Sequence, residues 1–292
     1  MATIKVWLPR PDWVAAMGGL PGRMAADVWT GGEDLPASAG EVQFVVLPFG
    51  TPSSRLSSLA KLPRLRVIQL MSAGAERVLG YVPPGVTLCT ARGAHDPAVA
   101  EWTMAVILGQ QRMLPEFMVA QQAGAWKPAV TEPLAGRTVL IGGYGSIGEA
   151  VERLLVPFGC KLERVARHPR PGVSGPDDLP VLIPQADIVI LLVPVTPATT
   201  RLVDARFLGL MHDHALLAEL NAGRLRAALD VTDPEPLPSG HPLWSAPGLL
   251  LTPHVAGLST QTIPRARVIV RDQLARYAAG ESLHNVVGAQ GY

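Results

Sequence analysis

A histidine and two carboxylates follow two apolar runs near the end of the chain. "ALDVTDPEPLP" (228–238) carries Asp230 and Glu235, and "LLLTPHVAG" (249–257) carries His254. Histidine is well suited to proton exchange near neutral pH, and a neighbouring carboxylate can hold and orient its ring. A lone histidine is more often a hydrogen-bonded structural residue. The carboxylate, the strand ends and the glycine motif described next together favour a general acid/base role.

A glycine-rich turn precedes these residues. "RTVLIGGYGSIGEAVERLL" (137–155) places the pattern G-x-G-x-x-G directly after an apolar strand and at the start of an amphipathic helix. In this context the first glycine permits the tight turn, the second lets the backbone approach a pyrophosphate, and the third lets helix and strand pack closely. The alternative is an ordinary strand-to-helix turn. The context favours a dinucleotide site formed by Gly143, Tyr144, Gly145, Ser146, Ile147 and Gly148.

The end of the next strand distinguishes between the two nicotinamide coenzymes. An acidic residue is expected there when the adenosine ribose carries free hydroxyls. "RVARHPRP" (164–171) instead provides Arg167, His168 and Arg170. Cations suit a 2′-phosphate, so NADP(H) is favoured over NAD(H). The alternative is that these are solvated basic residues of a loop.

These residues need an α/β scaffold, and the chain alternates accordingly. Short apolar runs at 3–8, 42–47, 66–71 and 87–89 predict a first parallel sheet. A helical period from Asp96 predicts a helix that ends near Pro115, and a second βα series follows from residue 137. The tail predicts a helix over 264–280 closed by Gly280. Two α/β domains with a long helix at their junction are expected.

Composition excludes several classes of protein. The chain has 292 residues, a net charge of +1 and scattered arginines, which argues against nucleic acid or an anionic membrane as partner. No apolar run approaches a membrane span, and two distant cysteines predict a reducing, cytoplasmic location. His212, Asp213 and His214 invite a metal interpretation, but without a further ligand cluster a polar turn is favoured. No metal site is predicted.

The motifs together resemble the D-2-hydroxyacid dehydrogenase family. The matching segments cover most of the chain in the family's order: "LRVIQLMSAGAERV" (65–78), "GAHDPAVAEWTMAVILGQQR" (93–112), "GGYGSIG" (142–148), "LLVPVTPATTRLVD" (191–204), "AALDVTDPEPLPSGHPLW" (227–244) and "LLLTPHVAG" (249–257). The resemblance implies two Rossmann-like domains with doubly wound parallel sheets. It places the substrate domain at 1–93 plus 258–292 and inserts the coenzyme domain at 94–257.

The resemblance also implies roles for single residues. His254 would exchange the proton on the substrate oxygen, with Glu235 as its partner. Asp230 would face the nicotinamide carboxamide. Backbone N–H groups at Ala73 and Gly74 would hold the substrate carboxylate. Val193, Pro194, Thr196 and Gly257 would line the coenzyme, and the substrate side-chain pocket would lie near Phe49 and Met71.

One part of the family's pattern has no counterpart in this sequence. Between "ILLVPV" and "AALDV" the family has a further strand ending in asparagine, two variable residues and Arg-Gly, whose arginine binds the substrate carboxylate. Here "LMHDHALLAEL" (210–220) joins the flanking segments directly, as if about fifteen residues were missing. Either the segment is deleted, which predicts weak turnover, or the printed sequence omits it. Four of the remaining arginines are expected on helix surfaces or loops: Arg201, Arg206, Arg224 and Arg226. Arg92 is expected near the presumed hinge.

The sequence therefore favours an NADP(H)-preferring reductase of a small 2-oxo acid such as glyoxylate or hydroxypyruvate. The main alternative is a non-catalytic dinucleotide-binding sensor or scaffold that has lost the arginine segment. An alanine dehydrogenase-like enzyme is less favoured, because it would not explain the pairing of Glu235 with His254. A homodimer is expected through the helix 97–114 and the segment around Trp126, with hinges near 93–94 and 256–258.

Overall fold

The computed structural model describes residues 3–210, 220 and 225–288. The chain divides into two compact units, residues 1–95 with 259–292 and residues 96–258. The bounds expected from the sequence differ from these by one or two residues.

Unit 1 is built on a five-stranded parallel sheet in the order β2-β1-β3-β4-β5. Its strands are β1 (Ile4–Leu8), β2 (Met24–Val28), β3 (Val42–Leu47), β4 (Val67–Leu70) and β5 (Thr87–Cys89). Four of them coincide with the apolar runs read from the sequence. The fifth, β2, was missed because "MAADV" has small and polar residues, which an edge strand tolerates.

Helices cover this sheet and complete its core. They are α1 (Trp13–Ala16), α2 (Ser53–Leu56), α3 (Glu76–Leu79) and α10 (Thr262–Ala279), with 3₁₀ turns at Ala37–Gly40 and Ser57–Lys61. Helix α10 buries Val270 and Leu274 against apolar side chains of the sheet, so the end of the sequence belongs to the same core as its beginning. It ends at Gly280, whose φ of 73° stops the helix as predicted.

Unit 2 contains two parallel sheets among the residues described. One has the order β7-β6-β8 and the other pairs β10 with β9. The strands are β6 (Thr138–Gly142), β7 (Lys161–Val165), β8 (Ile188–Leu191), β9 (Ala227–Leu229) and β10 (Leu249–Leu251). The helices are α4 (Asp96–Gln111), α5 (Leu114–Gln122), α6 (Ser146–Leu155), α7 (Leu179–Leu182) and α8 (Ala205–Leu210), with 3₁₀ turns at Val156–Phe158, Pro176–Asp178, Ile183–Gln185 and Pro242–Ser245.

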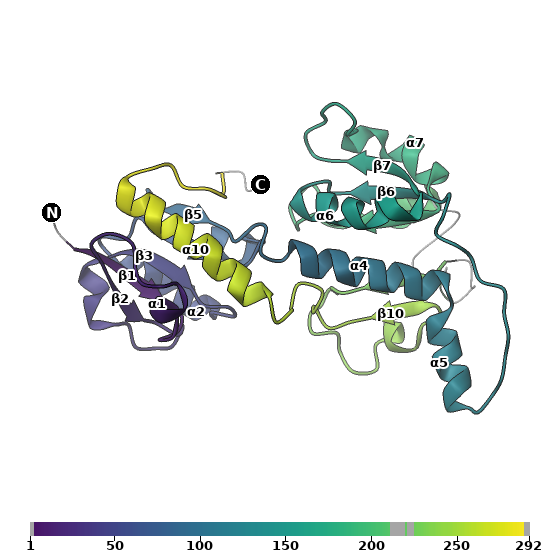
Figure 1. The fold of residues 1–292 in the computed structure, drawn as a ribbon, viewed down its shortest axis with the longest axis horizontal. Coiled ribbons are helices and arrows are strands. Elements are labelled where there is room, and N and C mark those ends of the chain that lie inside the picture. Colours follow the sequence, from purple (N-terminus) through teal and green to yellow (C-terminus); the bar gives the residue numbers. More distant parts are fainter. Residues whose placement is uncertain (1–2, 211–219, 221–224, 289–292) are drawn as a thin grey trace. The chain divides into compact units, whose positions relative to one another are not determined.

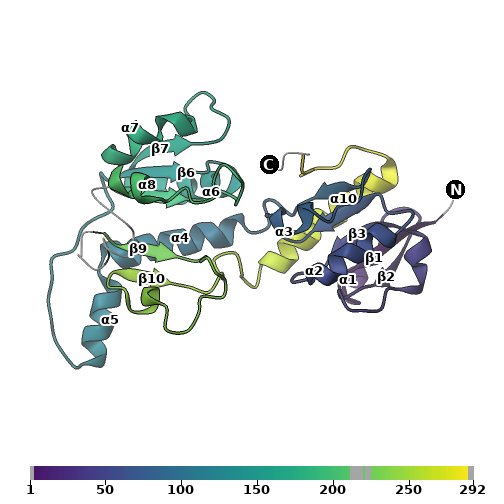
Figure 2. The same cartoon turned by 180° about the vertical axis from the view of Figure 1, so that it is seen from behind.

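Helix α4 connects the two sheets of unit 2 (Figures 1 and 2). Its Met104 and Ile107 pack in one core with residues of β6 and α6. At its other end the Gln110 side-chain amide donates to the carbonyls of Ala227 (3.0 Å) and Gly248 (3.1 Å), beside β9 and β10. A single helix thus supports both sheets.

The predicted end of this helix was wrong by four residues. Helix α4 ends at Gln111, and Met113 adopts the left-handed conformation with φ 54°. The chain turns there and starts α5, in whose first turn Pro115 lies. Proline is tolerated in the first turn because its missing N–H has no helical partner there, so Pro115 marks a beginning instead of an end.

Candidate active site

The glycine-rich turn joins β6 to α6. Gly143 has φ 89°, and a Cβ atom at this position would lie 2.7 Å from the backbone carbon of Leu192. A Cβ atom on Gly148 would lie 3.2 Å from Tyr144 Cδ2 and 3.3 Å from Ile141 Cγ2. Only glycine therefore suits position 143, and helix and strand meet closely at position 148. The carboxyl end of β6, the loop after β8 and the N-terminus of α6 converge, which fits the pyrophosphate of a dinucleotide.

The basic loop follows β7, and its three predicted residues are exposed: Arg167, His168 and Arg170. Arg170 reaches back to the turn, where its Nη2 donates to the carbonyl of Tyr144 at 3.1 Å. Its guanidinium carbon lies 5.4 Å from the centre of the Tyr144 ring. A cation of this loop is thus held beside the glycine-rich turn.

The loop after β8 carries Val193, Pro194 and Thr196. The Thr199 hydroxyl donates to the carbonyl of Pro194 at 2.5 Å and accepts from the backbone N–H of Thr196 at 2.8 Å. Leu192 donates its N–H to Gly142 O at 2.8 Å, which anchors the start of the loop to β6. The backbone that the resemblance assigns to coenzyme contact is therefore held next to the turn.

His254 and Glu235 are brought together by the loops that follow β10 and β9. The Nδ1 atom of His254 lies 2.8 Å from Oε1 of Glu235, as a hydrogen-bonded pair. Their side chains remain 60% and 46% exposed, so both are open to solvent. His254 has φ 56°, a left-handed conformation that non-glycine residues adopt uncommonly and that often occurs at functional sites.

Asp230 organises the loop that carries His254. Its Oδ1 accepts from the Thr252 hydroxyl (2.5 Å) and the Val255 N–H (2.9 Å), and its Oδ2 accepts from the Ala256 N–H (2.9 Å). Its backbone carbonyl also accepts from the N–H of His254 at 2.7 Å. Sequence reasoning missed this role, because nothing in the motif shows that the carboxylate turns toward residues 252–256.

The residues expected at the substrate lie in unit 1, whereas the His254–Glu235 pair lies in unit 2. Gly74 is exposed and its carbonyl accepts from the Ser72 hydroxyl at 2.7 Å, and Ala73 is half-buried. Phe49 is exposed and meets the ring of His95 edge-on at 6.0 Å. Sequence reasoning did not single out His95. Its Nε2 atom is hydrogen-bonded to the carbonyl oxygen of Met71 at 2.9 Å.

Sequence reasoning also missed a cluster of three side chains next to the glycine-rich turn: Tyr144, Glu152 and Arg164. Arg164 of β7 forms a two-point ion pair with Glu152 of α6, with Nε–Oε2 at 2.7 Å and Nη2–Oε1 at 2.5 Å. The Tyr144 hydroxyl donates to the same carboxylate. The hydrogen bond from Arg164 holds the pKa of Glu152 below its ordinary value, and burial, with the bond to Glu152, raises the pKa of Tyr144. At neutral pH the tyrosine is neutral and the carboxylate is charged.

Comparison with known proteins places these features in a family. The model of the D-isomer specific 2-hydroxyacid dehydrogenase NAD binding domain matches residues 104–256, just over half of the chain. The chain belongs to the D-2-hydroxyacid dehydrogenase family. It is 28% identical to a glyoxylate/hydroxypyruvate reductase A from Yersinia enterocolitica, over 90% of each protein.

Solved structures of this family resemble the chain over its whole length. A D-isomer specific 2-hydroxyacid dehydrogenase from Xanthobacter autotrophicus Py2, in complex with NADPH and MES, is 25% identical with a TM-score of 0.82, over 99% of both chains. An NADPH-dependent glyoxylate/hydroxypyruvate reductase from Sinorhizobium meliloti, in complex with NADP and sulfate, is 25% identical with a TM-score of 0.80, over 100% of both. The α/β fold with a Rossmann-like coenzyme domain is thereby confirmed.

The part of the chain where the family's substrate-binding arginine is expected lies mainly outside the described residues. Residues 211–219 and 221–224, which include His212, Asp213, His214 and Arg224, are not described. Arg201 and Arg206 are exposed. Arg226 donates to the carbonyl of Gln110 at 2.5 Å and precedes β9, whereas Asp230 follows it. Arg226 therefore lies at the opposite end of the strand from the His254 loop.

Within residues 3–210, 220 and 225–288, no helix is long and apolar enough to span a bilayer. The same residues contain no cluster of three or more His, Cys, Asp or Glu side chains able to hold a metal ion.

Proposed function

We propose that this dehydrogenase reduces a small 2-oxo acid such as glyoxylate or hydroxypyruvate, with NADPH preferred over NADH. The hydrogen-bonded pair of His254 and Glu235 carries the proposal, because it supplies a proton-exchanging group in the unit that contains the glycine-rich turn. Relatives named glyoxylate/hydroxypyruvate reductase support the substrate class.

The reduction adds a hydride to C2 of the 2-oxo acid and a proton to its carbonyl oxygen. The bound nicotinamide supplies the hydride. His254 donates the proton from Nε2, since Nδ1 is engaged by Glu235. Glu235 fixes the orientation of the ring before the transfer. In the reverse direction the same nitrogen accepts the proton of the hydroxyl group.

The coenzyme is proposed to bind at the glycine-rich turn, which includes Gly145, Ser146 and Ile147. The pyrophosphate would lie on the N–H groups that open α6, and the loop after β8 with Gly257 and Asp230 would border the nicotinamide. Arg167, His168 and Arg170 would meet the 2′-phosphate, because charge-assisted hydrogen bonds from guanidinium groups suit a phosphate monoester. This set of cations supports NADP(H) as the preferred coenzyme.

Binding of the substrate carboxylate is proposed for the backbone at Ala73 and Gly74, with Phe49 bordering the side-chain pocket. A dehydrogenase that lacks the arginine segment should turn over weakly, because this cation holds the carboxylate and polarises the carbonyl. A coenzyme-binding protein without turnover is the corresponding alternative.

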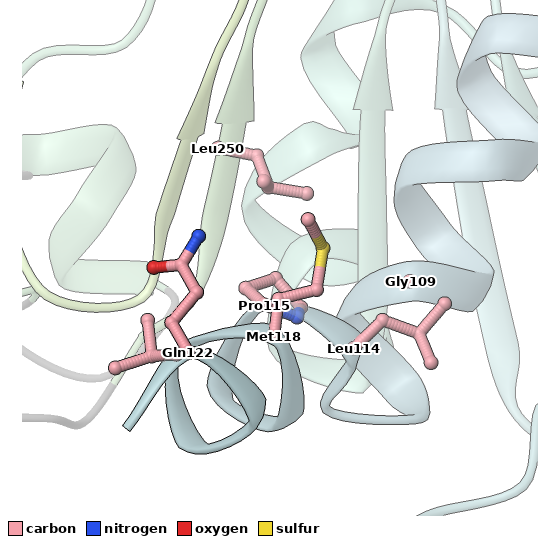
Figure 3. Close-up of a pocket in the computed structure, with 7 residues that line it drawn as sticks. Gly109, Leu114, Pro115, Met118, Gln122 and Leu250 are labelled. Atoms are coloured by element: carbon pink, nitrogen blue, oxygen red, sulfur yellow. The ribbon is translucent and has the colours of Figure 1, made fainter. Parts of the chain in front are cut away.

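A homodimer in a reducing cytoplasm completes the proposal. Helix α5 exposes Leu114, Met118 and Val119, and Trp126 beyond it is 96% exposed. A shallow apolar hollow of about 350 Å³ lies between α5, Gly109 of α4 and Leu250 of β10 (Figure 3). Apolar exposure of this kind is typical of a surface that is covered by a partner, and a second copy of the chain is the proposed one.

Intact mass and coenzyme oxidation test the proposal together. A mass near 30.9 kDa would show that the chain carries no additional segment. Oxidation of NADPH by glyoxylate or hydroxypyruvate, faster than that of NADH, is expected of the reductase. Binding of NADPH without oxidation by either acid would contradict the reductase and favour the non-catalytic alternative.

A further inference from the structure

The side chain of Tyr144 has no part in the function proposed above. Its backbone belongs to the glycine-rich turn, but its ring lies beside two cations. The guanidinium carbon of Arg164 is 5.8 Å from the ring centre, and that of Arg170 is 5.4 Å away. A guanidinium over an aromatic face is attracted by the ring's negative charge density, and the attraction grows where water is excluded.

Glu152 and Arg164 hold the ring of Tyr144 in place. The Tyr144 hydroxyl donates to Glu152, and that carboxylate receives two hydrogen bonds from Arg164. Arg164 also donates from Nη1 to the carbonyl of Leu162 at 3.2 Å. Glu152 is only 18% exposed, so the contacts are shielded from water. The charge of Arg164 is thereby neutralised, and the ring orientation is fixed by α6 and β7.

Arg170 is in a different situation. Its side chain is 43% exposed, and the nearest carboxylate, on Glu149, is 3.9 Å away. Its Nη2 donates to the carbonyl of Tyr144 at 3.1 Å, which leaves further donors of its five N–H groups for an anion. A long side chain loses about 2 kcal/mol of rotamer entropy when it is fixed. Contact with a rigid ring fixes it before the ligand arrives.

We propose that Tyr144 is a positioning residue for coenzyme choice: its ring, held by Glu152 and Arg164, keeps Arg170 oriented to receive the phosphate monoester on the ribose of NADP(H). The inference rests on the proposed preference for NADP(H) and names the group that sets it. Tyr144 acts through Arg170, and NADH, which has no 2′-phosphate, gains nothing from this arrangement.

The test measures equilibrium binding of NADPH and of NADH to the full chain by fluorescence titration. Tyr144→Leu, which removes the ring, is expected to weaken NADPH binding about five- to tenfold, the size of a cation–π contact at a partly exposed site, and to change NADH binding less than about twofold. Tyr144→Phe keeps the ring and loses the bond to Glu152, so a smaller loss, about two- to threefold, is expected. The ratio of the two dissociation constants is the readout, because a general disturbance of the turn weakens the binding of both coenzymes alike.

A double-mutant cycle with Arg170→Ala separates positioning from packing. Arg170→Ala should weaken NADPH binding in the parent protein and have little further effect in Tyr144→Leu, because both changes remove the same oriented cation. Independent effects would overturn the inference. If the parent and Tyr144→Leu both prefer NADPH, the inference about Tyr144 is overturned, whereas the proposed preference for NADP(H) stands. A parent that binds both coenzymes equally would overturn the proposed preference and this inference together.

Discussion

The imidazole of His254 is hydrogen-bonded through Nδ1 to the carboxylate of Glu235, 19 residues earlier in the chain, at 2.8 Å. The two residues follow different strands, β10 and β9, which are paired in parallel with Leu251 opposite Leu229. Parallel pairing places the carboxyl ends of both strands at one edge of the sheet, and this is why residues from two loops meet there.

Loss of His254 should abolish most of the turnover. His254→Asn removes the proton-exchanging nitrogen, and kcat for 2-oxo acid reduction is expected to fall about 10²–10⁴-fold with the Kd for NADPH unchanged. Glu235→Gln keeps the size of the side chain and removes its charge, with an expected fall of about tenfold. The control variant is His241→Asn, which changes a histidine whose Nδ1 accepts from the N–H of Leu243 at 3.3 Å. An equal loss in His241→Asn would contradict the assignment.

Asp230 should determine the order of the loop that carries His254. Asp230→Ala removes the acceptor of three hydrogen bonds and is expected to lower the free energy of unfolding by about 1.5–3 kcal/mol, measured by urea denaturation. Amide hydrogen exchange at Val255 and Ala256 should accelerate. Glu101→Ala, at an exposed position of α4, is the control and should change stability by less than about 0.5 kcal/mol. Unaltered exchange at both amides would argue against this role.

Gly143 should not tolerate a side chain. Gly143→Ala would place Cβ 2.7 Å from Leu192 C and 2.9 Å from Val193 N, at a φ of 89°. A loss of about 1–3 kcal/mol in unfolding free energy and of measurable NADPH binding is expected. Gly148→Ala meets its neighbours only at 3.2 Å or more and has no positive φ, so its effect on both quantities should be smaller. A larger loss in Gly148→Ala than in Gly143→Ala would show that the turn does not depend chiefly on Gly143.

The ion pair of Glu152 predicts a pH-dependent stability. The pKa of Glu152 is held below its ordinary value, chiefly by hydrogen bonds from Arg164. The contribution of this carboxylate to folding stability is therefore fully present above about pH 4.3 and is lost as the pH falls through the lowered pKa. Glu152→Gln should cost about 1–2 kcal/mol at pH 7, and the difference from the parent should shrink below about pH 4. Glu149→Gln, which alters a half-exposed residue of the same helix, should cost less than Glu152→Gln at pH 7. A difference that stays constant with pH would contradict the charged pair.

The apolar surface of α5 should be required for dimer formation. Met118→Glu places a charge where the side chain is 61% exposed, so a monomer should tolerate it, whereas a dimer formed through α5 should dissociate. Sedimentation equilibrium of the variant and parent measures this. Glu116→Gln on the same helix also changes the charge by one unit, but outside the apolar hollow, and is the control. A parent that sediments as a monomer would contradict the proposed dimer.

Much of the architecture could be predicted from local sequence. The apolar runs, the glycine-rich turn after β6 and the terminal helix closed by Gly280 depend on residue type and spacing alone. Strand β2 could not be read, because its small residues gain their strand conformation only by pairing with β1. The end of α4 depended on the backbone of Met113, whose left-handed conformation no residue type announces.

The sequence by itself determined which groups can do chemistry: an imidazole, two carboxylates, a glycine turn and a basic loop. Only the tertiary structure decided how these groups are divided. It directs Glu235 to the ring of His254, and it directs Asp230 to the backbone that holds this ring. It also brings Arg170 to Tyr144 across 26 residues. The physical reason is that hydrogen bonds of a few ångströms depend on how strands and helices pack, and spacing along the chain does not specify that packing.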